Sequence, residues 1–340
     1  MLIALGLIAA LLGATILTGW IRTYAFRQKI LDVPNARSSH SVPTPRGGGA
    51  SIVVVTLAAL CIALLLGWTG GNVFVALLVG GLLVAVVGWL DDRSHVPVRW
   101  RMLVHLAAAG WVVAWGGWVT SLPMPAGDLA LGWAAGPLCV IWIAWILNLY
   151  NFMDGIDGIA GTEAVTVSIA AAALLWHAQQ PSLAFVVAVI GVASLGFLRW
   201  NWPPAKVFMG DAGSAFLGFF FGSIALITHA LGAMVLWSWL ILLAVFLVDA
   251  TLTLARRLVR GERIYQAHRN HAYQHAARVL GSHRPVTVAV GLINLLWLAP
   301  LAMLAAWRPH WGILLVGIAW APLVIVAVRF QAGVPEAECI

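Results

Sequence analysis

The chain has 340 residues, of which 62% are hydrophobic and only 9% are charged. Soluble globular domains carry roughly 25% charged residues, so this composition excludes them and predicts a polytopic membrane protein. A formal net charge of +7 would suggest a nucleic-acid partner in a soluble chain. Here membrane topology explains it, and we expect no nucleic-acid partner. The three cysteines lie far apart and indicate neither a disulfide framework nor a zinc site.

Apolar segments of the length that a bilayer requires, about 17–25 residues, recur along the whole sequence. Residues 2–20 lack a basic leader region and a cleavage site, so we interpret them as a retained first helix. The predicted fold is an all-α transmembrane bundle of about eleven spans, with residues 1–340 as one integral membrane domain. The expected spans are 2–21, 49–68, 73–90, 102–120, 129–149, 163–179, 182–198, 212–230, 233–253, 286–306 and 310–328.

The distribution of positive charge predicts the orientation of these spans. If the N-terminus is periplasmic, every Lys and Arg except Arg308 lies in an inner loop or at the tail. Cytoplasmic loops carry such an excess of basic residues. We therefore predict a periplasmic N-terminus, a cytoplasmic C-terminus and chemistry on the cytoplasmic face. The predicted cytoplasmic loops are 22–48, 91–101, 150–162, 199–211 and 254–285.

Two amides and two acids lie at the inner end of the predicted span 129–149. Ionisable groups at membrane depth are costly, so they indicate a functional site. Asp154 and Asp157 are three residues apart, share a face on a helical turn and suit Mg²⁺. Asn148 and Asn151 can form hydrogen bonds with a sugar or ribose. The structural alternative is that Asp157 or Thr162 caps the following helix.

Three further acids are candidates for the same face. Asp91 and Asp92 are adjacent, and such a pair needs a cation, a nearby arginine or a shared proton. Asp211 lies between glycines at the start of a predicted helix, where free amides suit an anion and a carboxylate suits a bridging metal. The alternatives are a solvated acid pair for the first two, and N-capping of the helix by Asp211 or Ser214.

Basic side chains accompany these acids. Arg37 and Arg46 lie in a segment rich in Ser and Gly, whose side chains and backbone amides suit phosphate; the alternative is contact with anionic lipid. His268, Arg269 and His271 can neutralise a polyphosphate. Metal binding by these histidines lacks the usual motif, and the alternative is an ordinary basic loop. Together, the clusters indicate phosphoryl transfer between a soluble nucleotide and a lipid phosphate.

Two other functions use similar residues. A transporter or flippase for lipid-linked sugars would place charge near the midplane or at both faces, and inverted repeats are common in such proteins. A CDP-alcohol phosphotransferase also uses Asp-Gly pairs around a metal. Its signature continues with Ala-Arg and two further aspartates in one local run, which this chain lacks after Asp157.

Five segments in order resemble the polyprenyl-phosphate N-acetylhexosamine-1-phosphate transferases of glycosyltransferase family 4. They are DVPNARSSHSVPTPRGGG, GWLDDR, NLYNFMDGIDGIAG, VFMGDAGSAFLG and HRNHAYQH. The resemblance implies transfer of an N-acetyl-amino-sugar-1-phosphate from a UDP-sugar to undecaprenyl phosphate, with release of UMP. It further implies Mg²⁺ as cofactor, with Mn²⁺ as a second candidate. The expected location is the bacterial inner membrane, with the active site facing the cytoplasm and a homodimer as the candidate assembly.

The resemblance also assigns roles to residues of the five segments. Asp91 and Asp92 match the family's paired aspartates, Asp211 matches its principal Mg²⁺ ligand, and Phe208 matches an aromatic near uracil. The predicted catalytic residues are Asp91, Asp92, Asp154, Asp157, Asp211, His268 and His271. The predicted substrate-binding residues are Arg37, Arg46, Asn148, Asn151, Phe208, Lys206 and Arg269. The predicted metal ligands are Asp211, Asp154 and Asp157.

The chain departs from the family pattern at two places. Many members have adjacent histidines where this chain separates His268 from His271. The HRNHAYQH form resembles the branch that starts O-antigen with UDP-N-acetylfucosamine or a related 6-deoxy sugar, so we expect initiation of O-antigen or a related envelope polysaccharide. The second departure is His105, where the family pattern suggests glutamine.

Overall fold

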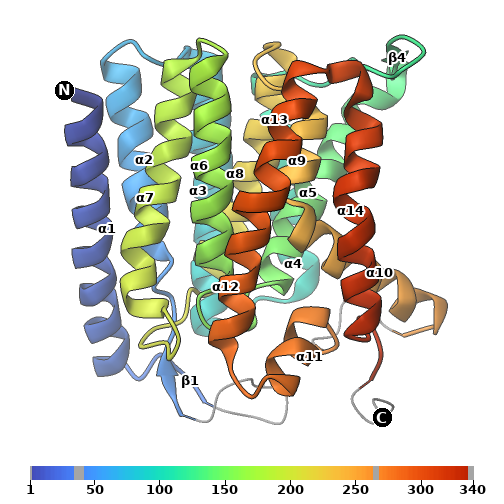
Figure 1. The fold of residues 1–340 in the computed structure, drawn as a ribbon. Coiled ribbons are helices and arrows are strands. Elements are labelled where there is room, and N and C mark those ends of the chain that lie inside the picture. Colours follow the sequence, from blue (N-terminus) through green and yellow to red (C-terminus); the bar gives the residue numbers. More distant parts are fainter. Residues whose placement is uncertain (1, 34–41, 263–267, 336–340) are drawn as a thin grey trace.

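Nearly all of the chain that can be described is helical (Figure 1). The computed structural model describes residues 2–33, 42–262 and 268–335, so Arg37 lies outside the described residues. The α-helices are α1 (Leu2–Arg27), α2 (Ala50–Leu65), α3 (Gly71–Ser94), α4 (Val98–Gly116), α5 (Ala135–Phe152), α6 (Ile159–His177), α7 (Pro181–Asn201), α8 (Asp211–Ala230), α9 (Leu236–Leu242), α10 (Ala244–Val259), α11 (Ala272–Val279), α12 (His283–Ile293), α13 (Ala299–Trp307) and α14 (Gly312–Arg329). Two short antiparallel pairs join β1 (Leu31–Asp32) to β2 (Thr44–Pro45) and β3 (Ser121–Leu122) to β4 (Leu129–Ala130). A π-helical turn (Asn294–Leu298) connects α12 to α13, and single 3₁₀ turns (Gly132–Ala134 and Pro309–Trp311) precede α5 and α14.

The prediction of an all-α, polytopic membrane protein is confirmed. Within the described residues, eight helices are long and apolar enough to cross a bilayer, and α9 with α10 makes a ninth if this pair, bent by 77°, is one span. Helix α2 is apolar but has only 16 residues. The predicted span 102–120 corresponds to α4, which begins with Arg99 and Arg101 in its first two turns. The count of eleven spans stays a prediction.

The helices run roughly parallel, and their ends divide the molecule into two faces (Figure 1). Helix α1 begins at one end of the bundle, whereas α14 ends at the other, where α11 lies across the helix ends. We call this second end the charged end, because α3 ends there with Asp91 and Asp92 and α8 begins there with Asp211. The two helices run in opposite directions, which brings the three acids together.

Helix α8 lies at the centre of the bundle. In its apolar window 94% of the residues are buried, compared with 17% in α1 at the edge. Membrane helices pack closely where small residues let backbones approach. A Cβ atom at Gly218 would lie 2.7 Å from the Cα of Leu147 on α5. Small residues therefore hold α8 against α5, which carries the amides of the predicted site.

A second close approach joins α8 to α3. A Cβ atom at Gly88 would lie 2.7 Å from the Cα of Ala212. Because residues four apart share one helix face, this contact brings Asp92 directly to the start of α8. Glycine at position 88 thus explains how an acid at the end of α3 reaches the first turn of α8.

Candidate active site

Asp92 caps the N-terminus of α8 from the neighbouring helix α3. Its Oδ1 accepts a hydrogen bond from the Asp211 amide at 2.8 Å, and its Oδ2 accepts one from the Ala212 amide at 3.2 Å. The first amides of a helix lack partners within the helix and attract negative charge. Gly210 has a φ of 78°, and a Cβ atom there would lie 2.5 Å from the Asp92 carboxylate. Asp92 of α3, and neither Asp211 nor Ser214, therefore caps α8, which differs from the alternative that the sequence suggested.

Asp211 is held by two arginines and an amide. Its Oδ1 accepts hydrogen bonds from Arg46 at 2.7 Å and from Asn151 at 3.1 Å, and its Oδ2 accepts one from Arg101 at 3.2 Å. The Asn151 amide also donates to the Ser214 hydroxyl at 2.9 Å. These groups come from four segments of the chain. The side chain of Asp211 is thus fixed in place at the charged end of the bundle.

The same two arginines connect all three acids. Arg46 forms a second ion pair with Asp92 at 2.8 Å, and Arg101 forms one with Asp91. Asp91 also accepts the Val96 amide at 2.7 Å. Arginine suits such bridging because its planar fork presents several donors. Of the three alternatives for the adjacent acids, a cation, a nearby arginine or a shared proton, the structure shows a nearby arginine for each acid.

Backbone pairing brings Arg46 into the site. The amide of Gly48 donates to the carbonyl of Phe208 at 2.9 Å, and the amide of Phe208 donates to the carbonyl of Pro45 at 2.8 Å. A third bond joins Gly49 to Met209 at 2.8 Å. Burial lowers the pKa of Arg46, but the carboxylates of Asp211 and Asp92 outweigh this effect and raise it above its usual range. Arg46 therefore stays charged.

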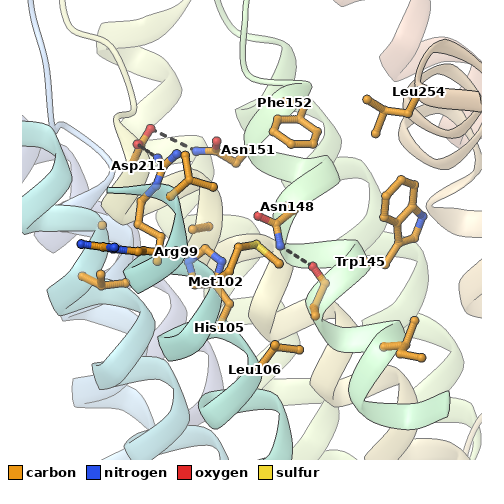
Figure 2. Close-up of a pocket in the computed structure, with 17 residues that line it drawn as sticks. Arg99, Met102, His105, Leu106, Trp145, Asn148, Asn151, Phe152, Asp211 and Leu254 are labelled. Atoms are coloured by element: carbon orange, nitrogen blue, oxygen red, sulfur yellow. Dashed lines mark hydrogen bonds and ion pairs between the residues drawn. The ribbon is translucent and has the colours of Figure 1, made fainter. Parts of the chain in front are cut away.

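An apolar groove of about 720 Å³ leads away from this cluster between α4 and α5 (Figure 2). Its polar end is formed by Asp211, Asn151 and Arg101. Farther along, its walls are formed mainly by apolar side chains, among them Met102, Leu106, Ile141, Ala144 and Trp145. A groove with a polar end and apolar walls suits a lipid with an anionic head.

Asp154 and Asp157, predicted to act together, have different surroundings. Asp157 accepts the Ala205 amide at 3.0 Å and lies 3.3 Å from His283. The carboxylate of Asp154 is half-buried and forms no hydrogen bond with the described residues. Burial and the charge of Asp211 raise the pKa of Asp154 well above its ordinary value, and Arg46 opposes the shift. A bound cation would favour the ionised form of Asp154, which is the property expected of a metal ligand.

The donor groups at the charged end fit a Mg²⁺ ion that is completed by substrate. Among the described residues, no three His, Cys, Asp or Glu side chains converge as a metal cage. Mg²⁺ is usually held by one or two carboxylates together with substrate phosphates and water. Asp211 and Asp154 could supply such carboxylates. Asp157 is less suited, because its carboxylate already accepts a backbone amide and lies beside His283.

Helix α11 is docked at the charged end by Asp249 of α10. The carboxylate of Asp249 accepts the amides of Ala272 and Tyr273, both at 2.9 Å, and lies 3.2 Å from Nδ1 of His271. His268 stacks on His271 with ring centroids 4.9 Å apart. Neither histidine lines the groove beside Asp211. His271 is only 1% exposed and contacts Asp249, so it contributes to the packing of α11 against α10.

Tyr273 links α11 to the segment that carries Asn151 and Asp154. Its hydroxyl donates to the carbonyl of Phe152 at 3.1 Å and leaves no room for a side chain at Gly155. Burial and the charge of Asp249 raise the pKa of the Tyr273 hydroxyl well above its usual value. The hydroxyl therefore stays protonated and can serve as the donor in this bond.

We expect Asp249→Asn to loosen α11. The amide group replaces one carboxylate acceptor, so the buried amides of Ala272 and Tyr273 lose part of their pairing, at a cost of about 1–3 kcal/mol. Hydrogen exchange at residues 272–279 should then become faster by about tenfold, since 1.4 kcal/mol corresponds to that factor. Asp128→Asn, at the opposite end of the bundle, is the matched control. Unchanged exchange in α11 would contradict the capping role of Asp249.

The remaining predicted residues lie around a second, polar cavity, on the surface, beside the loop of Arg46 or in the wall of the apolar groove. This cavity, of about 630 Å³, is lined by Arg269, Asp157, Gln274 and His283, with further arginines at positions 278 and 284. Lys206 is exposed. Phe208 is half-buried beside the loop of Arg46. Asn148 lines the groove and donates to the carbonyl of Ala144 at 2.7 Å.

Sequence reasoning gave no site role to Arg101 or Ser214. Among the described residues, Arg101 is the only side chain that forms ion pairs with both Asp91 and Asp211. A usable signal existed, because an arginine in the second turn of an apolar helix must reach either solvent or an acid. Ser214, which the sequence suggests only as a helix cap, instead accepts a hydrogen bond from Asn151 and orients it.

The fold and the site together define a polytopic helical membrane protein with a bridged acid–arginine cluster at one face. Residues 74–229 match the family described as glycosyl transferase family 4. A probable undecaprenyl-phosphate N-acetylglucosaminyl 1-phosphate transferase of Bacillus subtilis is 31% identical over 87% of this chain and 83% of its own length. A decaprenyl-phosphate N-acetylglucosaminephosphotransferase of Mycolicibacterium smegmatis is 28% identical over 85% and 78%. A phospho-N-acetylmuramoyl-pentapeptide-transferase of Synechococcus sp. is 31% identical over 73% and 72%. The chain belongs to glycosyl transferase family 4.

Proposed function

We propose that this protein transfers an N-acetyl-amino-sugar-1-phosphate from a UDP-sugar to undecaprenyl phosphate, releasing UMP. The observation that carries the proposal is the cluster of Asp211, Arg46 and Arg101 at the mouth of an apolar groove. A polyprenyl phosphate matches this arrangement, because its anionic head suits the charged cluster and its hydrocarbon chain suits the apolar groove. The activities for which the similar proteins are named support the acceptor class and the reaction.

The proposed chemistry is direct in-line displacement at the β-phosphorus of the donor. An oxygen of the lipid phosphate forms a bond to this phosphorus, and the bond to the bridging oxygen of UMP breaks, leaving its electron pair on UMP. The second pKa of a phosphate monoester is about 6, so the acceptor is mostly dianionic at neutral pH. A strong base is therefore not needed, and positioning with charge neutralisation dominates catalysis.

The chain's own residues divide these tasks. Arg101 and Arg46 bind and orient phosphate oxygens, and Asp211 and Asp154 are the proposed Mg²⁺ ligands. When bound, Mg²⁺, or Mn²⁺ in its place, supplies positive charge that offsets the charge on the departing UMP. Asp92 accepts two backbone amides and an arginine, so it preserves the start of α8 rather than accepting a proton. Asp91 orients Arg101.

The alternative functions have less support. In a lipid-linked sugar transporter, charge would lie near the midplane or at both faces, whereas the bridged acids and arginines of this protein gather at one end of the bundle. A CDP-alcohol phosphotransferase would use its aspartates in one local run. Here Asp91, Asp92 and Asp211 meet from two helices that lie far apart in the sequence.

The cellular role follows from the same proposal. We place the protein in the bacterial inner membrane with the charged end facing the cytoplasm, where UDP-sugars are available. The product would start O-antigen or a related envelope polysaccharide, with UDP-N-acetylfucosamine or a related 6-deoxy sugar as the preferred donor. A homodimer is the proposed assembly. The similar proteins named above act on N-acetylglucosamine or N-acetylmuramoyl-pentapeptide substrates, so N-acetylglucosamine is the alternative donor.

The decisive experiment incubates the purified protein with undecaprenyl phosphate, Mg²⁺ and each of several UDP-N-acetyl sugars. We expect UMP release that requires both the lipid phosphate and the divalent ion, with the highest kcat/KM for one donor. Omission of the lipid distinguishes transfer from hydrolysis. Absence of UMP release with every donor, from folded protein, would overturn the enzymatic proposal.

A further inference from the structure

Glu163 is a buried carboxyl group that lies outside the site described above. It belongs to the second turn of α6, a helix long and apolar enough to span the bilayer, and its side chain is fully buried. It forms no ion pair with the residues that the structure describes. An ionised carboxylate at membrane depth is costly unless a cation accompanies it. This environment therefore favours the neutral carboxylic acid.

Asn294 pairs with this carboxyl group from a neighbouring helix. It begins the π turn that follows α12 and is 2% exposed. Its Nδ2 donates to Oε2 of Glu163 at 2.7 Å and to Oγ1 of Thr166 at 2.8 Å, which uses both hydrogens of the amide. Oδ1 of Asn294 and Oε1 of Glu163 are buried and have no hydrogen-bond partner among the described residues. With Glu163 ionised, both of these oxygens are acceptors, and neither can satisfy the other.

One proton on Glu163 changes this balance. A protonated carboxyl group has one O–H donor and keeps an acceptor oxygen, so it complements a primary amide, which has a donor beside an acceptor. Oε2 accepts the hydrogen bond from Nδ2 of Asn294, and an O–H at Oε1 can donate to Oδ1 of the same amide. Buried polar atoms left unpaired are costly. The proton therefore removes a buried charge and also pairs two buried oxygens.

The same face of α12 contacts the loop that precedes α6. Thr287 lies seven residues before Asn294, and its hydroxyl donates to the carbonyl of Asp157 at 2.8 Å. Between these two positions, a Cβ atom at Gly291 would lie 3.1 Å from the methyl carbon of Thr162, so α12 packs closely on the start of α6. A shift of α12 along α6 would therefore displace the contact at Asp157.

We propose that Glu163 is held in its protonated form, and that its two hydrogen bonds with Asn294 fix α12 against α6 and so position the loop that carries Asp154. This inference rests on the proposed function, in which Asp154 is a Mg²⁺ ligand. Glu163 touches neither substrate and is a positioning residue. The acid–amide pair holds α12, Thr287 of α12 holds the carbonyl of Asp157, and the carboxylate of Asp154 three residues earlier thereby keeps its place.

The test compares Glu163→Gln with Glu163→Leu in the purified full-length protein. Glutamine is neutral and presents a donor and an acceptor to Asn294, whereas leucine leaves the Asn294 amide unpaired. We expect kcat for UMP release to stay within about twofold of wild type in Glu163→Gln and to fall by about 10- to 100-fold in Glu163→Leu. The KM for undecaprenyl phosphate should be unchanged in both, because the groove beside Arg101 is not altered. His310→Leu, at the opposite end of the bundle, is the control. A loss of about tenfold or more in Glu163→Gln would overturn the neutral pair.

Infrared spectroscopy measures the protonation of Glu163 without any substrate. The difference spectrum of wild type minus Glu163→Gln at neutral pH should contain the C=O stretching band of a protonated carboxylic acid. A carboxylate band in its place would overturn the inference. If Glu163→Leu fails to fold, this spectrum and the turnover of Glu163→Gln decide the question.

Hydrogen exchange tests the positioning role and keeps it separable from the proposed reaction. Exchange at residues 154–158 should become about tenfold faster in Glu163→Leu and stay at the wild-type rate in Glu163→Gln. Unchanged exchange in both variants would contradict the positioning role. If the wild type shows the carboxylic acid band and this exchange pattern but releases no UMP, the reaction is contradicted and the acid–amide pair stands.

Discussion

Asp211→Asn is expected to lower turnover by at least about 100-fold, the scale on which loss of one group that stabilises developing charge acts. The substitution removes a charge that two arginines now neutralise, at 2.7 Å and 3.2 Å. It also removes a proposed Mg²⁺ ligand, while the amide keeps the size and shape of the side chain. The first amides of α8 remain capped by Asp92, so the helix should stay in place. Initial rates of UMP release at saturating donor and lipid measure the effect.

Asp128→Asn provides the matched control for this variant. Asp128 has a 60% exposed side chain beside His310 at the end of the bundle away from the site. We expect full turnover from this control and equal amounts of folded protein, measured by size-exclusion chromatography in detergent. Near-normal turnover by Asp211→Asn would remove Asp211 from the reaction centre, whatever its contacts with Arg46 and Arg101.

Arg101→Ala is expected to lower kcat/KM by at least about 30-fold. Removing one partner of a buried, hydrogen-bonded charge pair costs roughly 2–5 kcal/mol. Each 1.36 kcal/mol added to the activation free energy lowers the rate about tenfold. Without this arginine, Asp91 loses its ion-pair partner and Asp211 loses one of its two ion-pair partners among the described residues. The polar end of the groove would also repel a phosphate.

Arg101→Lys separates charge from geometry. Lysine keeps the positive charge but not the planar fork that reaches two carboxylates. We therefore expect an intermediate kcat/KM for Arg101→Lys and wild-type behaviour for Arg329→Lys at the end of α14. If Arg101→Lys matched the wild type, charge alone would suffice and the bridging geometry would be unimportant. Thermal unfolding of each variant shows whether a loss reflects the fold instead.

Several features of the fold and site could be predicted from the sequence because they depend on local composition. Runs of apolar residues indicate membrane helices, and all-helical membrane architecture follows because backbone groups in lipid must pair within the segment. Acids such as Asp154 and Asp211 stood out for the same reason, since charge at membrane depth is costly. The bent pair of α9 and α10 and the docking of α11 by Asp249 carry no comparable local signal.

Which acid contacts which base depended on the tertiary structure. Asp92 meets the amide of Asp211 across 119 residues of sequence, and Arg101 meets the same aspartate across 110. These pairings require that α3 and α8 run in opposite directions and approach closely at Gly88.

The sequence by itself determined the class of protein, the charged face and the polar residues from which the site is built, because hydropathy and charge act residue by residue. Only the tertiary structure decided that Asp92 caps α8, that Asp157 accepts a backbone amide beside His283, and that His105 faces a groove. Such roles arise from distances between helices, and close packing sets those distances.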